Sequence, residues 1–178
     1  MWNSRDIALI IMFAVLSFVF QVVIGQIPNL ITGIAGIGYV FTIVYSITQT
    51  VAWLIFDGRR WRIFTFGLLF TLLCMSVIQS WTPPVVMATI LNIFIVDLVF
   101  NSLHGSFKRK NKLVWWAILT QGYYWTTHPL LILSFSRMFF AVEAVAPIMS
   151  LILPLMIIEA IAGSYIGYKI YRRVEKLA

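Results

Sequence analysis

Charged residues and cysteines are scarce in this sequence. Charged side chains make up 11% of the 178 residues, whereas hydrophobic side chains make up 61%. A soluble domain of this length exposes far more charge, so the composition predicts an integral membrane protein. The single cysteine, Cys74, excludes an intrachain disulfide and any metal site built from several cysteines.

The short motifs that mark many enzymes are also missing. The sequence has no H-E-x-x-H, no G-x-S-x-G, no P-loop and no Asp-rich metal box. The two histidines, His104 and His128, fall in different apolar segments at different expected depths, which does not predict a metal site. We therefore expect no catalytic residues, no metal and no cofactor. Transport driven by ATP would require a partner that binds the nucleotide.

Long apolar segments make up most of the chain. A helix rises about 1.5 Å per residue, so about 20 apolar residues cross a bilayer, and in lipid only a helix satisfies the backbone of such a segment. The segments are 7–25, 36–56, 63–80, 84–103, 113–135 and 146–170. They predict an all-α fold, a bundle of six transmembrane helices that forms one domain over residues 1–178. No small-residue cleavage site follows the first segment, so we expect it to be a span and not a signal peptide.

The basic residues predict the orientation of the bundle. With the N-terminus inside, all of the 13 Lys and Arg except Arg137 fall on the cytoplasmic side. The positive-inside rule therefore places both termini in the cytoplasm. The net charge of +7 then suits the anionic inner leaflet and gives no reason to expect nucleic acid as a partner. The segments 26–35, 80–84 and 136–147 would lie outside, 80–84 as a tight turn and the other two as interfacial turns or as lids.

Polar and aromatic residues share one face of the segment 113–135. This polar-aromatic stripe consists of Gln121, Tyr124, Trp125 and His128, spaced i, i+3, i+4 and i+7. Aromatic rings beside hydrogen-bonding groups suit a small-molecule pocket, in which rings stack and polar groups orient the ligand. The same groups suit hydrogen bonds between helices. The sequence leaves both interpretations open.

The segment 84–103 carries polar residues on two faces. Asp97, Asn101 and His104 share a face near the cytoplasmic end. A carboxylate at this depth needs a partner, so we expect Asp97 to form an ion pair. Asn92 lies about 140° away around the helix, near the midplane, and is the better pocket candidate. The expected partners of Asp97 are Arg59, Arg62 and Lys169.

The last apolar segment places a carboxylate and two glycines on one face. Gly163 and Gly167 form a G-x-x-x-G, which permits close approach of a second helix. Glu159 lies one turn before Gly163, near mid-membrane, where it must be paired, protonated or hydrated. A proton relay is one use of such a group.

Four stretches of the chain together resemble a known family. They are RDIALIIMFAVLSFV near the N-terminus, the glycine-rich IPNLITGIAGIGYV, LNIFIVDLVF before a basic loop, and the C-terminal IEAIAGSYIGYKIYRRVEK. With the length and the expected six helices, these make the chain similar to the substrate-binding (S) subunit of an energy-coupling factor (ECF) vitamin transporter. The resemblance implies a multi-pass protein of a prokaryotic cell membrane that captures a vitamin-like molecule from outside. It also implies docking on a membrane scaffold subunit coupled to two ATPases.

The resemblance further implies which residues bind the substrate and which dock on the scaffold subunit. The family's pocket lies in the outer half of the bundle, and its first helix often presents a small-x-x-x-small surface to the scaffold. With the stripe, the candidate substrate-binding residues are Gln26, Asn29, Asn92, Gln121, Tyr124, Trp125 and His128. The nearest matches to the docking surface are Ser4 with Ala8, and Ala14 with Ser17, the latter pair at a spacing of i+3.

Two other functions stay open. The chain has the makeup of a non-catalytic structural subunit in a multi-subunit membrane enzyme complex, in which the stripe would bind neighbouring helices. A small membrane enzyme using His128 and Glu159 is a third reading, although no nucleophile or metal ligand accompanies them.

Overall fold

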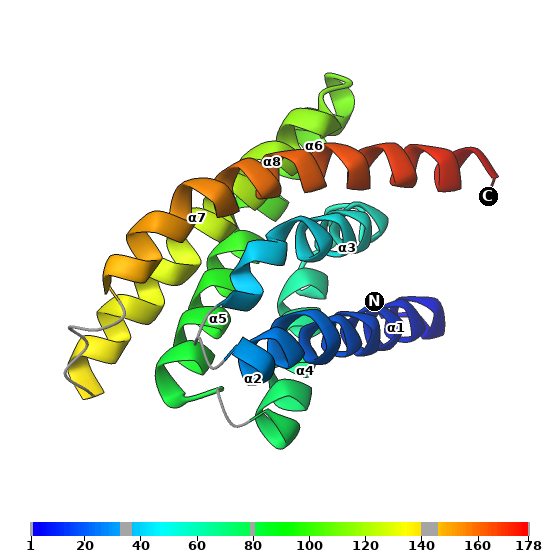
Figure 1. Ribbon diagram of the computed structural model, residues 1–178. Helices are drawn as coiled ribbons and strands as arrows, with labels where there is room; N and C mark the ends of the chain where they lie inside the picture. The colour runs from blue at the N-terminus through cyan, green and yellow to red at the C-terminus, as the bar shows by residue number, and fades with distance from the viewer. Residues whose placement is uncertain (1, 33–36, 79–80, 140–145, 178) are drawn as a thin grey trace.

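The computed structural model describes residues 2–32, 37–78, 81–139 and 146–177 (Figure 1). In this part of the chain the regular structure is entirely helical and forms six continuous helices, which confirms the all-α class. In chain order they are α1 (Ser4–Phe20) continued by η1 (Gln21–Gln26) and α2 (Ile27–Thr32); η2 (Ile37–Phe41) with α3 (Thr42–Ile55); α4 (Arg62–Val77); α5 (Pro83–Ile95) continued by η3 (Val96–Phe100) and α6 (Asn101–Arg109); α7 (Leu113–Phe139); and α8 (Ala146–Leu177).

Three of these helices are long and apolar enough to cross a membrane. They cover Ser4–Gln26, Pro83–Arg109 and Ile152–Lys176, and the shorter helices Tyr39–Ile55 and Arg62–Val77 are also apolar. Their large apolar side chains are exposed on the outside of the bundle, as at Val23, Leu72 and Ile158. An apolar exterior of this kind indicates association with a membrane.

The first helix continues beyond the predicted turn at residues 26–35. Pro28 has no backbone N–H to donate, which normally ends or kinks a helix. The preceding turn, η1, is a wider π-type turn, in which Ile27 N donates to Val22 O. This turn changes the hydrogen-bond register just before Pro28, and the helix continues to Thr32. Residues 26–32 are therefore helical, and 33–36 lie outside the described residues.

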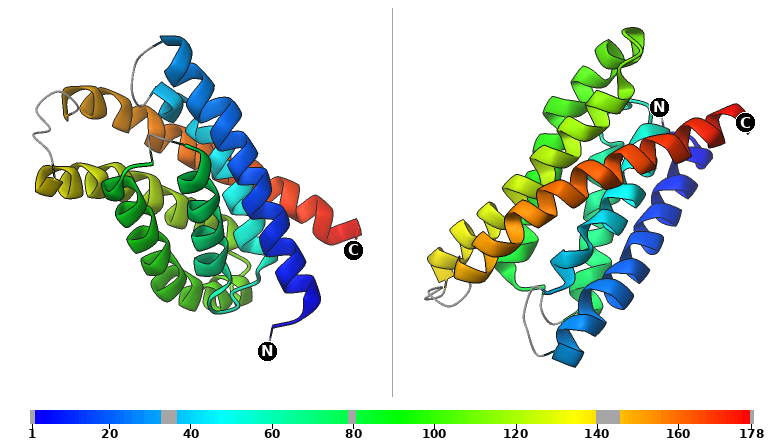
Figure 2. Two further views of the ribbon diagram at one scale, coloured as in Figure 1. Left: turned by 90° about the horizontal axis from the view of Figure 1, so that it is seen from below. Right: turned by 45° about the horizontal axis from the view of Figure 1, so that its top comes forward.

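The helices form a closed ring in which each packs against the next. The order around the ring is α1, α4, α5, α7, α8 and α3, with α3 returning to α1 (Figures 1 and 2). α3 and α8 approach each other closely: a Cβ added at Gly163 would lie 2.6 Å from Ile43 O, and one at Gly167 would lie 2.8 Å from Ile47 O. The predicted close contact at this G-x-x-x-G is thus confirmed.

Ion pairs gather several basic segments at one end of the molecule. Asp6 at the start of α1 binds Arg59 and Arg62, at 2.8 and 2.7 Å, and Asp57 binds Lys108 at 2.6 Å. These contacts join α1, the turn between α3 and α4, and the end of α6. Both termini lie toward this end, which we name the basic end (Figure 2, right).

Candidate functional site

The polar-aromatic stripe of α7 faces the interior of the bundle. Gln121, Tyr124, Trp125 and His128 are 0%, 2%, 5% and 6% exposed, respectively. On the opposite face of the same helix, Trp115 is 56% exposed. The helical spacing in the sequence therefore predicted a real face, and this face is directed at protein and not at lipid.

Hydrogen bonds join this stripe to α5. Asn92 is fully buried, donates from Nδ2 to Tyr124 O at 2.9 Å, and accepts at Oδ1 from Thr127 Oγ1 at 2.9 Å. The hydroxyl of Thr89 lies 3.0 Å from His128 Nε2. The predicted midplane residue Asn92 thus lies beside the stripe, where it ties two helices together.

The Thr89 contact decides which nitrogen of His128 carries the proton. Thr89 Oγ1 donates its own hydrogen to Val85 O at 2.8 Å, so toward His128 it has a lone pair to offer. This network assigns the proton of the neutral ring to His128 Nε2, and Nδ1 is then a hydrogen-bond acceptor.

A second stripe on α3, which the sequence analysis missed, faces the first. Tyr45, Gln49 and Trp53 are spaced i, i+4 and i+8, and are 6%, 7% and 1% exposed. The ring of Tyr45 lies 5.9 Å from Trp125, and that of Trp53 lies 5.9 Å from Tyr124. The same periodicity that marked α7 was present in YSITQTVAW and would have identified this face.

Tyr39 extends this group of rings toward the start of α3. Its ring lies 6.4 Å from Trp125 and 6.4 Å from His128, while Tyr124 and His128 stack at 5.3 Å with an angle of 16° between planes. These separations are those of rings in direct contact. The rings of α3, η2 and α7 therefore form a packed cluster, which we name the ring cluster, with no open channel indicated between the described side chains.

Several polar atoms within the ring cluster have no hydrogen-bond partner among the described residues. Gln121 Oε1 accepts from Trp125 Nε1 at 3.0 Å, which leaves Gln121 Nε2 as a free donor. The other unpaired atoms are Trp53 Nε1, a donor, and Gln49 Oε1 and His128 Nδ1, both acceptors. Two donors and two acceptors are thus buried among rings with their hydrogen-bonding capacity unused.

The remaining candidates for substrate binding lie at the end of the first helix. Gln26 is half-buried at the end of η1, and η1 packs against η2, which carries Tyr39. The backbone of Asn29 lies in α2, and its side chain lies outside the described residues. Asn92 therefore contacts the stripe directly. Gln26 and Asn29 belong to the end of the first helix, which approaches the stripe through its contacts with η2.

The four small residues predicted to form a docking surface do not share a face. Ser4 and Ala8 are exposed, whereas Ala14 and Ser17 are 0% and 5% exposed and face the interior. The second pair packs within the bundle, so any outward surface of α1 has to be built from its exposed apolar side chains together with Ser4 and Ala8.

Asp97 is buried, and its observed hydrogen bonds go to backbone and amide groups. Its two carboxylate oxygens accept from Trp61 N at 3.0 Å and Phe64 N at 2.8 Å, and Asn101 Nδ2 approaches at 3.3 Å. The carboxylate that pairs with the arginines is Asp6. The expectation of an ion pair is thus corrected: Asp97 anchors the start of α4, because the left-handed turn at Trp61 directs two amides at it.

Glu159 also has a structural partner. Its Oε2 accepts from Ile43 N at 3.1 Å, in the first turn of α3. A carboxylate at this position satisfies an otherwise unpaired amide and opposes the positive end of the helix dipole. Glu159 therefore caps α3 at the same α3–α8 contact that Gly163 and Gly167 make close.

Within residues 2–32, 37–78, 81–139 and 146–177, no group of three or more His, Cys, Asp or Glu side chains is placed to hold a metal ion. His104 is buried against Trp116, with ring centroids 4.9 Å apart.

No family model matches this chain, and no curated protein or solved structure is significantly similar to it.

Proposed function

We propose that this chain is a membrane-embedded substrate-binding subunit that captures a small, vitamin-like molecule from outside the cell. In this proposal six helices cross a prokaryotic cell membrane with both termini in the cytoplasm. The observation that carries it is the set of unpaired donors and acceptors in the ring cluster: Gln49 Oε1, Trp53 Nε1, Gln121 Nε2 and His128 Nδ1.

Unpaired buried polar atoms are costly, and this cost supports a ligand. Each buried group without a hydrogen bond destabilises the folded state by about 1–3 kcal/mol. Four such atoms on two facing helices are therefore unfavourable for a bundle that only has to hold together. A ligand with its own donors and acceptors would satisfy them.

The chemistry of the ring cluster favours a planar, uncharged ligand. Its hydrogen-bonding groups are amides, an indole and a neutral imidazole, and its walls are the rings of Tyr39, Tyr45, Tyr124 and Trp125. Aromatic faces stack on a heterocycle, and neutral groups do not compensate a buried charge. Because these rings are in contact with one another, the ligand has to displace some of them when it binds.

Uptake would depend on partner proteins. The sequence has no nucleotide-binding motif, so energy from ATP has to come through a membrane scaffold subunit and two ATPase subunits. The exposed face of α1, with Ser4, Ala8 and apolar side chains such as Ile11 and Val15, is the part of the bundle that we propose for the scaffold.

Thermal unfolding of the purified protein with a panel of vitamins tests binding. A ligand at about 100 times its Kd stabilises the folded state by about 2.7 kcal/mol, which raises the unfolding temperature. Trp53→Phe keeps a ring but removes the unpaired donor, so we expect a weaker shift with the same ligand. Trp115→Phe is the matched control, because Trp115 is exposed on the outer face of α7.

A shift that Trp53→Phe and Trp115→Phe leave equally large would place the ligand elsewhere. No shift with any compound would favour the second function, a structural subunit of a membrane enzyme complex. One observation supports that alternative: Asn92, Thr127 and Thr89 already join α5 to α7 through hydrogen bonds, as helix-packing residues do. Co-purification with a pair of ATPases would separate the two functions.

A further inference from the structure

We propose that the outer groove between α4, α5 and α7 binds one anionic phospholipid, with an acyl chain in the groove and the phosphate on Arg60. This inference rests on the membrane placement proposed above and is independent of substrate binding in the ring cluster.

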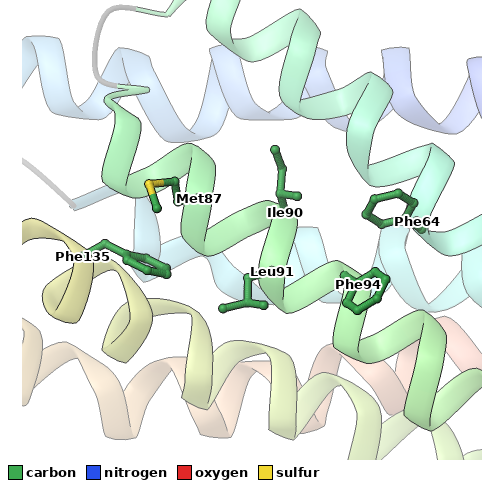
Figure 3. A pocket seen from close by; sticks show the side chains of 6 residues that line it. All are labelled: Phe64, Met87, Ile90, Leu91, Phe94 and Phe135. Carbon is green, nitrogen blue, oxygen red and sulfur yellow. The ribbon is translucent and has the colours of Figure 1, made fainter.

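The groove is apolar along its whole length. Its volume is about 380 Å³, and it is lined by Phe64 of α4, Met87, Ile90, Leu91 and Phe94 of α5, and Phe135 of α7. Figure 3 shows Met87 and Phe135 toward one end, Phe64 and Phe94 at the other, and Ile90 and Leu91 between them. From Met87 to Phe94 the helix rises about 10 Å, so the groove runs along the helix axis as an acyl chain in a leaflet does.

Phe64 and Phe94 form the end of this groove that is nearer the basic end, and Trp61 packs against both rings. Phe64 and Phe94 lie 5.7 Å apart, and Trp61 lies 6.0 Å from Phe64 and 6.3 Å from Phe94. Trp61 is 47% exposed. Tryptophan with one side on apolar groups and the other exposed is typical of the membrane–water interface. Trp61 thus extends the aromatic end of the groove toward the basic end.

The backbone holds Trp61 in place. Its φ of 69° is left-handed, a conformation that a bulky residue rarely adopts. The buried carboxylate of Asp97 accepts from both Trp61 N and Phe64 N and so stabilises this turn. Hydrogen bonds from the backbone of Trp61 and Phe64 to the buried Asp97 therefore fix the position of the aromatic end of the groove.

One arginine at this end is available for an anion. Arg59 and Arg62 bind Asp6, but Arg60 is exposed, and within the described parts of the chain no acidic side chain pairs with it. Arg60 directly precedes Trp61, whose ring packs on Phe64 and Phe94 at the aromatic end of the groove. A guanidinium binds phosphate through charge-assisted hydrogen bonds. An apolar groove with a free cation at one end complements an amphiphile with an anionic headgroup better than an apolar partner helix.

Native mass spectrometry of the detergent-solubilised protein with added lipid tests this site. We expect phosphatidylglycerol to bind about fivefold more tightly than phosphatidylcholine, the ratio that corresponds to about 1 kcal/mol for one arginine at an anionic headgroup. Arg60→Gln should remove this preference. Arg109→Gln, which removes an exposed charge from the end of α6, should retain it.

Filling the groove gives a second, independent measurement. Leu91→Trp puts a large ring inside it and should weaken binding of both lipids, whereas Leu98→Trp, at an exposed position outside it, should not.

Equal binding of the two lipids by the wild type, or equal effects of Arg60→Gln and Arg109→Gln, would overturn the proposal. It would also be overturned if Leu91→Trp dissociated a dimer but left lipid binding unchanged, since the groove would then be a protein interface. Vitamin-induced thermal shifts report on the ring cluster separately.

Discussion

Two aspartates show how far single residues can be interpreted from sequence. The spacing of Asp97, Asn101 and His104 predicted that they share one face, and the structure buries all three, which are 4%, 3% and 1% exposed. The partner of Asp97 was not predictable, because it depends on the backbone turn at Trp61. Asp6 directly follows Arg5 in the sequence, yet it binds Arg59 and Arg62, which lie 53 and 56 residues away.

Replacing the Asp97 carboxylate should destabilise the fold. In Asp97→Asn one acceptor oxygen becomes a donor that faces a backbone N–H, so one of the two amides at Trp61 and Phe64 loses its bond. We expect a loss of about 1–3 kcal/mol in the free energy of unfolding. Denaturant titration of the purified protein in detergent measures it.

Asp57→Asn is the matched control for this variant. Asp57 forms an exposed ion pair with Lys108, and exposed pairs contribute about 0–1 kcal/mol. Its φ of 52° is also one that asparagine tolerates well. Equal losses for the two variants would contradict an anchoring role for Asp97.

At the level of elements, periodicity predicted faces better than ends. The stripe on α7 and the glycine face of α8 were predicted correctly, and the facing stripe on α3 had the same signal. Helix ends were less predictable, because the π-type turn η1 carries the first helix past Pro28, which would otherwise end it. Which candidate atoms stay unpaired depends on distances between helices, which no single segment encodes.

The α3–α8 contact gives a prediction at this scale. An alanine Cβ at Gly163 would lie 2.6 Å from Ile43 O and 2.8 Å from Ser46 Cβ, so the two helices have to separate. We expect Gly163→Ala to destabilise the protein by about 1–3 kcal/mol. Separation would also lengthen the bond between Glu159 and Ile43 N. Thermal unfolding in detergent is the measurement.

Gly122→Ala provides the comparison on α7. A Cβ at Gly122 meets nothing within 4 Å, so the substitution should be neutral or stabilise by up to about 1 kcal/mol through helix propensity. If Gly163→Ala proved as well tolerated as Gly122→Ala, the α3–α8 contact would be looser than described.

For the whole molecule, the order of helices was the least predictable feature. Short connections favour packing between neighbours in sequence, yet α3 packs on α8 and α4 packs on α1. Specific contacts determine which helices pack together: the glycines of α8 permit close packing of α3, and the ion pairs of Asp6 join α1 to the start of α4. The residues that make these contacts can be located in the sequence, but the helix that each of them contacts is known only from the three-dimensional structure.

Membrane topology is the prediction that concerns the entire chain. Because Cys74 is fully buried, the wild type should react little with a membrane-impermeant maleimide, and single cysteines can be introduced against this background. Lys110 and Glu175 are exposed toward the basic end, and Arg137 is exposed on α7 close to its other end. In intact cells we expect Arg137→Cys to be labelled and Lys110→Cys and Glu175→Cys to be labelled only after the membrane is opened.

The charge distribution predicts this result, since placing the basic end outside would move nearly all positive residues to the disfavoured side. Labelling of Lys110→Cys in intact cells would contradict the orientation, and equal labelling of all three would mean that the helices do not alternate across the membrane.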